Sequence, residues 1–236
     1  MESRYYLKNL DNIIVALDVD HRDQAFRLID VLGEKIKTYK VGPQLFTRSG
    51  PEVIDYLHHS KKQIFVDLKL HDTPQVVFET IKQLAEMGVD FATVHCLGGK
   101  KMLEAASQGC RNSKLKLLGI TLLTSFDPME ATYWDWETSA EKSVPRLAQL
   151  AQEARLKGIV CSVSEAASLR RIVSPGFLLV TPGIRPQKKE VYLEDQRRIA
   201  SPEEAIASGA DYLIIGRPII QNRDPRLATD NIFERA

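Results

Sequence analysis

Short apolar runs that resemble buried strands recur along the chain, and a segment with helical periodicity follows each of them. This alternation is typical of βα units whose strands form a parallel sheet. The runs span residues 12–19, 36–41, 64–69, 91–96, 115–123, 158–161, 177–180 and 211–215. Eight such units on 236 residues favour one closed (β/α)8 barrel, a single α/β domain over residues 1–236, rather than a doubly wound open sheet.

Composition excludes several classes of function. The formal net charge is +1 and no long basic run is present, so we expect no nucleic-acid partner. The longest apolar runs are too short to cross a bilayer, and the N-terminal residues have no secretion signal, so we expect no membrane association. Cys96, Cys110 and Cys161 are odd in number and lack metal-ligand spacing. They indicate reduced thiols in a cytoplasmic enzyme.

Polar residues stand where most of the expected strands end. In a (β/α)8 barrel the active site lies at the carboxyl ends of the strands, so these side chains should converge. No metal-ligand motif is evident, and we interpret the two histidines of this region, His71 and His95, as packed or hydrogen-bonded. The strand-end residues are Asp18, Lys40, Asp67, Lys69, His95, Thr124, Ser125, Pro182 and Arg217.

The third strand ends in a cluster of charges. Asp67 and Lys69 are two residues apart, so an extended strand projects both to the same side, and Asp72 follows closely. If that side is the interior, the charges must be paired, because a buried unpaired charge is costly. A carboxylate neighbour favours the charged form of Lys69, which suits a proton donor. The alternative is a solvated strand end with surface ion pairs.

Gly216 and Arg217 are the best candidates for binding a phosphate group. Barrels often bind phosphate with the loops after strands seven and eight and the N-terminus of a short helix. The long polar loop 183–196 lies between the same strands, and with Arg185 and Gln196 near its ends it could fold over a bound phosphate. The alternative is a glycine turn with a surface arginine.

Motifs along nearly the whole chain resemble those of the orotidine 5′-phosphate decarboxylase family. The order and spacing of the motifs are more specific than any motif alone. They are ALDV at 16–19, YKVG at 39–42, DLKLHD at 67–72, VH and GG within 94–99, LTS at 123–125, TPGIRP at 181–186, DQRR at 195–198 and IGRPI at 215–219.

The resemblance implies decarboxylation of orotidine 5′-monophosphate to uridine 5′-monophosphate without metal or cofactor. Lys69 would protonate C6 of the pyrimidine after carbon dioxide leaves, and Asp67 would lie beside the departing carboxylate. Asp18 and Lys40 would hold the ribose hydroxyls and complete the charged catalytic network of Lys40, Asp67, Lys69 and Asp72. Asp72 would enter the site of a neighbouring subunit, so the resemblance implies a homodimer with shared sites.

The resemblance also implies contacts to the rest of the nucleotide. Thr124 and Ser125 would lie near the base, and Pro182 would form part of its apolar wall. Four further residues would bind the phosphate: Arg185, Gln196, Gly216 and Arg217.

The chain departs from the family pattern after Asp72. The family usually reads Ile-Pro-Asn-Thr there, whereas this chain reads TPQV at 73–76. Val76 lacks the usual threonine hydroxyl, which puts one partner-subunit contact to the ribose in doubt. Thr73 is the nearby candidate, although its position does not establish that it replaces the missing group. We expect the change to alter affinity and not the reaction.

Two other functions fit parts of the pattern. Related barrels that act on sugar phosphates as decarboxylases or aldolases share the Asp-x-Lys-x-x-Asp core but use magnesium, with an acidic residue where Lys40 stands. A phosphate-binding barrel without catalysis is the second alternative. The complete set of charges disfavours it, because a binding protein gains little from a carboxylate directed at an anion.

Overall fold

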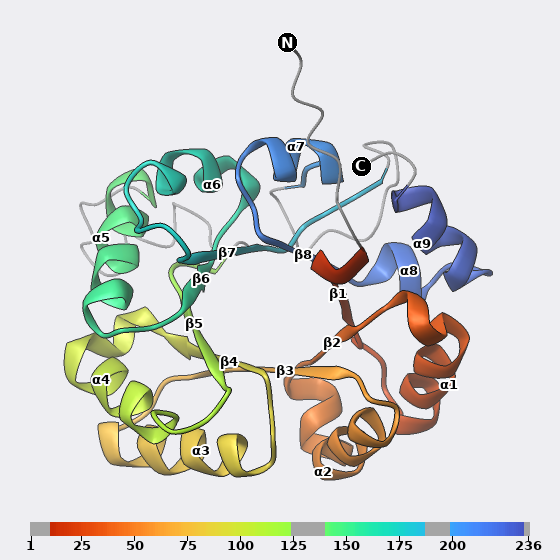
Figure 1. Ribbon diagram of the computed structural model, residues 1–236, viewed down its shortest axis with the longest axis horizontal. Helices are drawn as coiled ribbons and strands as arrows, with labels where there is room; N and C mark the ends of the chain where they lie inside the picture. Colours follow the sequence, from red (N-terminus) through yellow and green to blue (C-terminus); the bar gives the residue numbers. More distant parts are fainter. Residues whose placement is uncertain (1–9, 124–139, 187–198, 234–236) are drawn as a thin grey trace.

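The computed structural model describes residues 10–123, 140–186 and 199–233, and in these ranges eight parallel strands close into a barrel in the order β1 to β8. Figure 1 shows the strands in a ring with the helices around it. The (β/α)8 fold predicted from the sequence is therefore confirmed. The strands are β1 (Ile13–Ala16), β2 (Thr38–Val41), β3 (Gln63–Leu70), β4 (Phe91–His95), β5 (Lys116–Ile120), β6 (Gly158–Val160), β7 (Leu178–Thr181) and β8 (Tyr212–Ile215).

Helices follow the strands and cover the outside of the barrel. Within the described ranges, none of them is long and apolar enough to cross a membrane. They are α1 (Arg22–Leu32), α2 (Pro43–His59), α3 (Pro74–Glu86), α4 (Gly99–Gly109), α5 (Ala140–Glu153), α6 (Val163–Arg170), α7 (Pro202–Ala207), α8 (Arg217–Ile220) and α9 (Pro225–Phe233).

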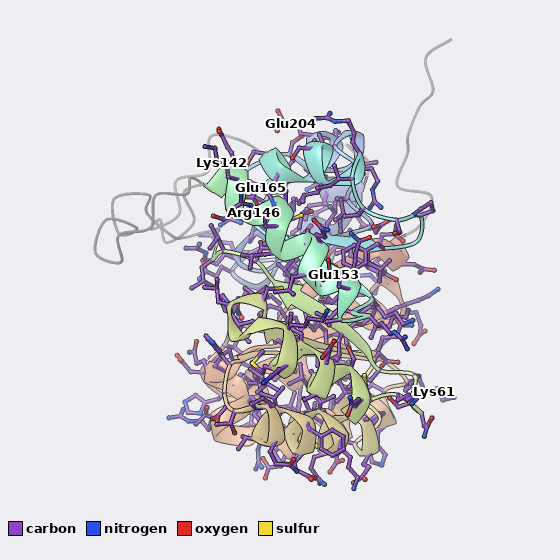
Figure 2. All side chains as sticks on the ribbon, turned by 90° about the vertical axis from the view of Figure 1, so that its left-hand side faces the viewer. Lys61, Lys142, Arg146, Glu153, Glu165 and Glu204 are labelled. Atoms are coloured by element: carbon purple, nitrogen blue, oxygen red, sulfur yellow. The ribbon has the colours of Figure 1, made fainter. Side chains whose placement is uncertain are left out.

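Helix α5 illustrates why the sequence forms this outer layer. Val144, Ala148 and Ala151 are buried at spacings of four and three residues, which place them on one face of a helix. The opposite face carries charged residues, and Figure 2 labels Lys142 and Arg146 among the side chains of this helix. The apolar face packs on the barrel and the charged face meets solvent.

A separate apolar cluster fills the floor of the barrel. Successive strand residues point to opposite sides, so Ile13 and Val15 of β1 pack under the helices while Ile14 and Ala16 belong to the interior cluster. Its other buried members are Phe65, Phe91, Leu118, Val180 and Ile214. Polar groups at the carboxyl ends of the strands therefore lie above a tightly filled, apolar floor.

Candidate active site

A cavity of about 440 Å³ opens at the carboxyl ends of the strands. This volume lies within the range of about 300–1,000 Å³ that is usual for small-molecule sites. Eight of the residues predicted from the sequence line it together: Asp18, Lys40, Asp67, Lys69, Pro182, Arg185, Gly216 and Arg217.

Asp67, Lys69 and Lys40 form a connected cluster of charged residues with the Asp67 carboxylate at its centre. Asp67 Oδ2 lies 2.9 Å from Lys69 Nζ and 3.5 Å from Lys40 Nζ. Lys40 Nζ also lies 3.2 Å from Asp18 Oδ1. Asp67 is 7% exposed and Lys40 is 8% exposed, which excludes the alternative of a solvated strand end with surface ion pairs. The cluster continues outward to Asp18, whose side chain is half exposed.

The pairing outweighs burial in setting the charge of both buried groups. Burial alone would raise the pKa of Asp67, but the positive charges of Lys40 and Lys69 leave it below the usual range. Burial alone would lower the pKa of Lys40, but the carboxylates of Asp67 and Asp18 leave it above the ordinary value. At neutral pH both groups are charged.

The backbone of β3 is irregular where it carries this cluster. Val66 pairs with Ala92 and Leu70 pairs with Val94, so four residues of β3 advance against two of β4. Lys69 has a φ of 49°, in the left-handed region that side chains other than glycine seldom adopt. The predicted contact between Asp67 and Lys69 is confirmed. Strand alternation alone does not account for it, because the bulge interrupts the alternation.

Thr93 of β4 belongs to this cluster and was missed from the sequence. It is fully buried, and its hydroxyl bonds both Asp67 and the backbone of Lys69. One sequence feature could have identified it. Phe91 points into the barrel, so the residue two positions later in the same strand points there too, and a polar residue at such a position is informative.

The cavity is also lined by the groups expected to bind phosphate. Gly216 precedes α8 and lies close to the charged cluster, because a Cβ there would be in van der Waals contact with Asp18 Oδ2 at 3.4 Å. Arg217 is the first residue of the short helix α8, which excludes the alternative of a simple glycine turn. Arg185 is 6% exposed, and its Nη1 donates to the carbonyl of Ile184 at 3.0 Å. Both arginines are among the residues that line the cavity.

Asp72 and Thr73 do not join these residues within the chain. Both are exposed, and neither is among the described residues that line the cavity. Asp72 Oδ1 accepts a hydrogen bond from the backbone N–H of Thr73 at 2.6 Å. The chain by itself therefore leaves the third carboxylate of the DLKLHD motif outside the site.

The two histidines near the site pack against each other and His95 is hydrogen-bonded, as expected, whereas His71 is also exposed to solvent. The rings of His71 and His95 stack with centroids 5.3 Å apart, and His95 Nδ1 accepts from the backbone N–H of Leu97 at 3.3 Å. Burial, followed by the nearby His71 and Lys69, lowers the pKa of His95. In the part of the chain that the structure describes, no group of three or more His, Cys, Asp or Glu residues could hold a metal ion.

Some predicted positions lie outside the described residues. These are Thr124, Ser125 and Gln196 and most of the loop 183–196. Their predicted roles at the base and phosphate stay predictions.

Comparison with known proteins agrees with the motifs. The model of the orotidine 5′-phosphate decarboxylase / HUMPS family matches residues 11–232. An orotidine 5′-phosphate decarboxylase from Desulfosudis oleivorans is 42% identical over 224 residues, which cover 92% of this chain and 90% of that protein. One from Nitrosococcus oceani is 43% identical over 218 residues, 92% of this chain and 93% of that protein. The crystal structure of orotidine 5′-phosphate decarboxylase from Lactobacillus acidophilus superposes with a TM-score of 0.83 at 33% identity, covering 95% of this chain and 98% of that one.

Proposed function

The chain belongs to the orotidine 5′-phosphate decarboxylase / HUMPS family, and on this premise we propose that it decarboxylates orotidine 5′-monophosphate to uridine 5′-monophosphate, with Lys69 as the acid. The observation that carries the proposal is the buried Asp67 carboxylate held between two lysines at the cavity wall. No cofactor takes part in the proposed reaction.

The charged cluster suits a reaction in which negative charge moves from a carboxylate to carbon. When the bond between C6 and the carboxylate breaks, its electron pair stays on C6 and carbon dioxide leaves. The ammonium of Lys69 stabilises the developing charge and then gives its proton to C6, which leaves a neutral amine that solvent protonates again. Asp67 lies beside the departing carboxylate, where a second negative charge raises the energy of the bound substrate more than that of the transition state.

The residues that line the cavity suit the two ends of a nucleotide. Asp18 and Lys40 offer an acceptor and a donor for ribose hydroxyls, while Arg185 and Arg217 offer planar sets of donors for phosphate oxygens. Pro182 contributes apolar surface for the base. We propose Thr124, Ser125, Gln196 and Gly216 as further substrate contacts on the strength of the motifs that contain them.

Lys40 argues against the magnesium-dependent alternative. Its ammonium lies between the carboxylates of Asp18 and Asp67, the two oxygen groups that a divalent cation would otherwise approach. Its raised pKa keeps it charged, so it repels a cation there. A phosphate-binding barrel without catalysis would gain little from the buried Asp67 carboxylate directed at an anion.

We propose that the active unit is a homodimer in which each subunit lends Asp72 to the other's cavity. Asp72 and Thr73 are exposed, and so is the apolar side chain of Val76, three residues after Thr73, at 48% exposure. Packing of this exposed surface against a second subunit would cover Val76 and carry Asp72 to the partner's cavity. The same packing would bring Thr73 toward the partner's ribose site, near where the family carries the hydroxyl that Val76 lacks.

Mixed dimers test the shared site. Lys69→Ala and Asp72→Ala homodimers should each be inactive. After subunit exchange between equal amounts, half of the dimers combine the two variants, and one of their two sites then carries both intact residues. Activity should recover to about a quarter of the wild-type value per subunit. No recovery, with exchange confirmed by mass spectrometry, would contradict the shared site.

The reaction itself is tested by the loss of orotate absorbance with orotidine 5′-monophosphate as the sole substrate. Turnover should persist after exhaustive chelation of metals. Absence of turnover would refute the proposed reaction, and turnover that disappears with chelator and returns with magnesium would refute the metal-free mechanism. We place the reaction in the cytoplasm, in keeping with the three free cysteines.

A further inference from the structure

The irregular segment of β3 needs a partner to hold its shape. Between Val66 and Leu70 the strand leaves the ladder of hydrogen bonds, and Lys69 adopts its left-handed backbone conformation within this stretch. A side chain other than glycine in that region persists only where its surroundings impose it. The proton donor of the proposed reaction therefore stands on backbone that the strand alone does not specify.

Thr93 of β4 lies opposite this segment and bonds to it twice. Its Oγ1 accepts a hydrogen bond from the backbone N–H of Lys69 at 2.8 Å and donates one to Asp67 Oδ1 at 2.9 Å. The direction of both bonds is fixed, because an amide can only donate and a carboxylate can only accept. The side chain is fully buried, so water does not compete for either bond.

The bond to Asp67 also sets the rotation of its carboxylate. Oδ1 faces Thr93, and this leaves Oδ2 facing Lys69 Nζ at 2.9 Å and Lys40 Nζ at 3.5 Å. One hydroxyl thus contacts both the carboxylate that meets the substrate and the backbone of the residue that delivers the proton.

We propose that Thr93 is a positioning residue for the decarboxylation: its hydroxyl fixes the position of the Lys69 backbone relative to the carboxylate of Asp67. It does so from below the cavity and is not among the described residues that line it. Loss of the hydroxyl therefore impairs the chemical step and leaves nucleotide binding nearly unchanged. The inference rests on the proposed function and adds to it a residue outside the substrate contacts.

Two pairs of variants isolate the hydroxyl from the shape of the side chain. Thr93→Val differs from wild type by the loss of the hydroxyl from a branched side chain. Thr93→Ala differs from Thr93→Ser by the same loss in a smaller side chain. The rate of a single turnover should be about 100-fold lower in Thr93→Val than in wild type, and about 100-fold lower in Thr93→Ala than in Thr93→Ser. Misplacement of reacting groups by about 1 Å costs a factor of this size. Thr93→Ser should stay within about fivefold of wild type, and the Kd of uridine 5′-monophosphate should change by less than about threefold in all variants.

Thr38→Val is the matched control. Thr38 is also fully buried on a strand, and its hydroxyl donates to Gln63 Oε1 at 2.9 Å, away from the charged cluster. This variant should lose stability comparable to Thr93→Val and keep its turnover rate. Turnover of Thr93→Val within about threefold of wild type, or an equal fall in Thr93→Ser and Thr93→Ala, would overturn the proposal.

Hydrogen exchange at the Lys69 amide gives a readout that does not depend on activity. Exchange of this amide should accelerate at least about tenfold in Thr93→Val relative to Thr38→Val, because its acceptor has been removed. Unchanged exchange would overturn the positioning role even if turnover fell. If wild-type protein does not convert orotidine 5′-monophosphate, the proposed function fails while this measurement still decides whether Thr93 holds Lys69.

Discussion

Replacement of Lys40 by methionine should expose how strongly the buried charges depend on one another. The variant keeps most of the volume of the side chain and removes the ammonium that lies between Asp67 and Asp18. At an effective dielectric constant of about 20, unit charges at the 3.5 Å separation of Lys40 Nζ and Asp67 Oδ2 interact by about 5 kcal/mol. Removal of one partner from a buried pair costs about 3–5 kcal/mol. We expect about 3 kcal/mol, because Lys69 remains beside Asp67.

A double-mutant cycle separates this coupling from the loss of packing. Unfolding by urea would be measured at one protein concentration for wild type, Lys40→Met, Asp67→Asn and the double variant. Lys40→Met should cost less in the Asp67→Asn background, with a coupling of about 2 kcal/mol, near the upper part of the range for residues in contact. A coupling below about 0.5 kcal/mol is ordinary for independent sites and would refute the interpretation of the cluster.

Lys62→Met is the control for this cycle. Lys62 is also 8% exposed, but its Nζ donates to the carbonyl of Gly33 at 2.7 Å, and its carboxylate neighbour Glu34 is fully exposed. Its replacement should destabilise the protein to the same extent with and without Asp67→Asn. A coupling between Lys62 and Asp67 would mean that the cycle measures a general change in the fold.

Two further predictions concern packing and pH. A Cβ at Gly109 of α4 would lie 2.7 Å from the carbonyl oxygen of Phe78 in α3. Gly109→Ala should therefore lower the free energy of unfolding by about 1–3 kcal/mol. As a control, Gln108→Ala at the neighbouring exposed position should change it by less than about 0.5 kcal/mol. The pKa of His95 is lowered by burial, His71 and Lys69, so its contribution to stability is complete above its ordinary value of 6.5 and is lost as pH falls toward the folded value. Urea unfolding between pH 7.5 and 5 should therefore show a shallower loss in His95→Asn than in wild type or in the exposed-histidine control His59→Asn, and equal slopes would contradict this assignment.

Much of the fold follows from the sequence because the physical cause is local. Apolar runs and helical periodicity predicted the strand order and the barrel, and Gly88 at the end of α3 has the positive φ, 72°, expected of a helix C-terminus. The ends of elements were less accurate. The expected strands 12–19 and 115–123 are longer than the observed β1 and β5, because the loops that follow these two strands also contain apolar residues. Helix α2 runs from Pro43 to His59 through Pro51, and its backbone departs from helical geometry at Ser49, two residues before the proline.

The sequence predicted many of the residues that line the cavity, but less of how they are arranged. Lys40, Asp67 and Lys69 were found because charged residues at buried strand ends are unusual. The bulge in β3 depends on its pairing with β4, and the role of Thr93 depends on that bulge, so neither follows from the pattern of one strand. Helices α8 and α9 were missed because each is short and begins at or next to a proline, a pattern that also suits a loop. The proposed role of Asp72 requires a second chain.

The most direct test of the central claim is a single turnover of orotidine 5′-monophosphate by Lys69→Ala. Lys61→Ala is the control, because Lys61 has a comparable φ of 54° but is exposed at the edge of the molecule (Figure 2) and is not among the described residues that line the cavity. Lys69→Ala should slow the reaction by about 100-fold to 10,000-fold, which is the contribution of a positioned acid, and should still bind uridine 5′-monophosphate. Lys61→Ala should react at the wild-type rate. Turnover by Lys69→Ala within about tenfold of wild type would contradict the assignment of Lys69 as the proton donor.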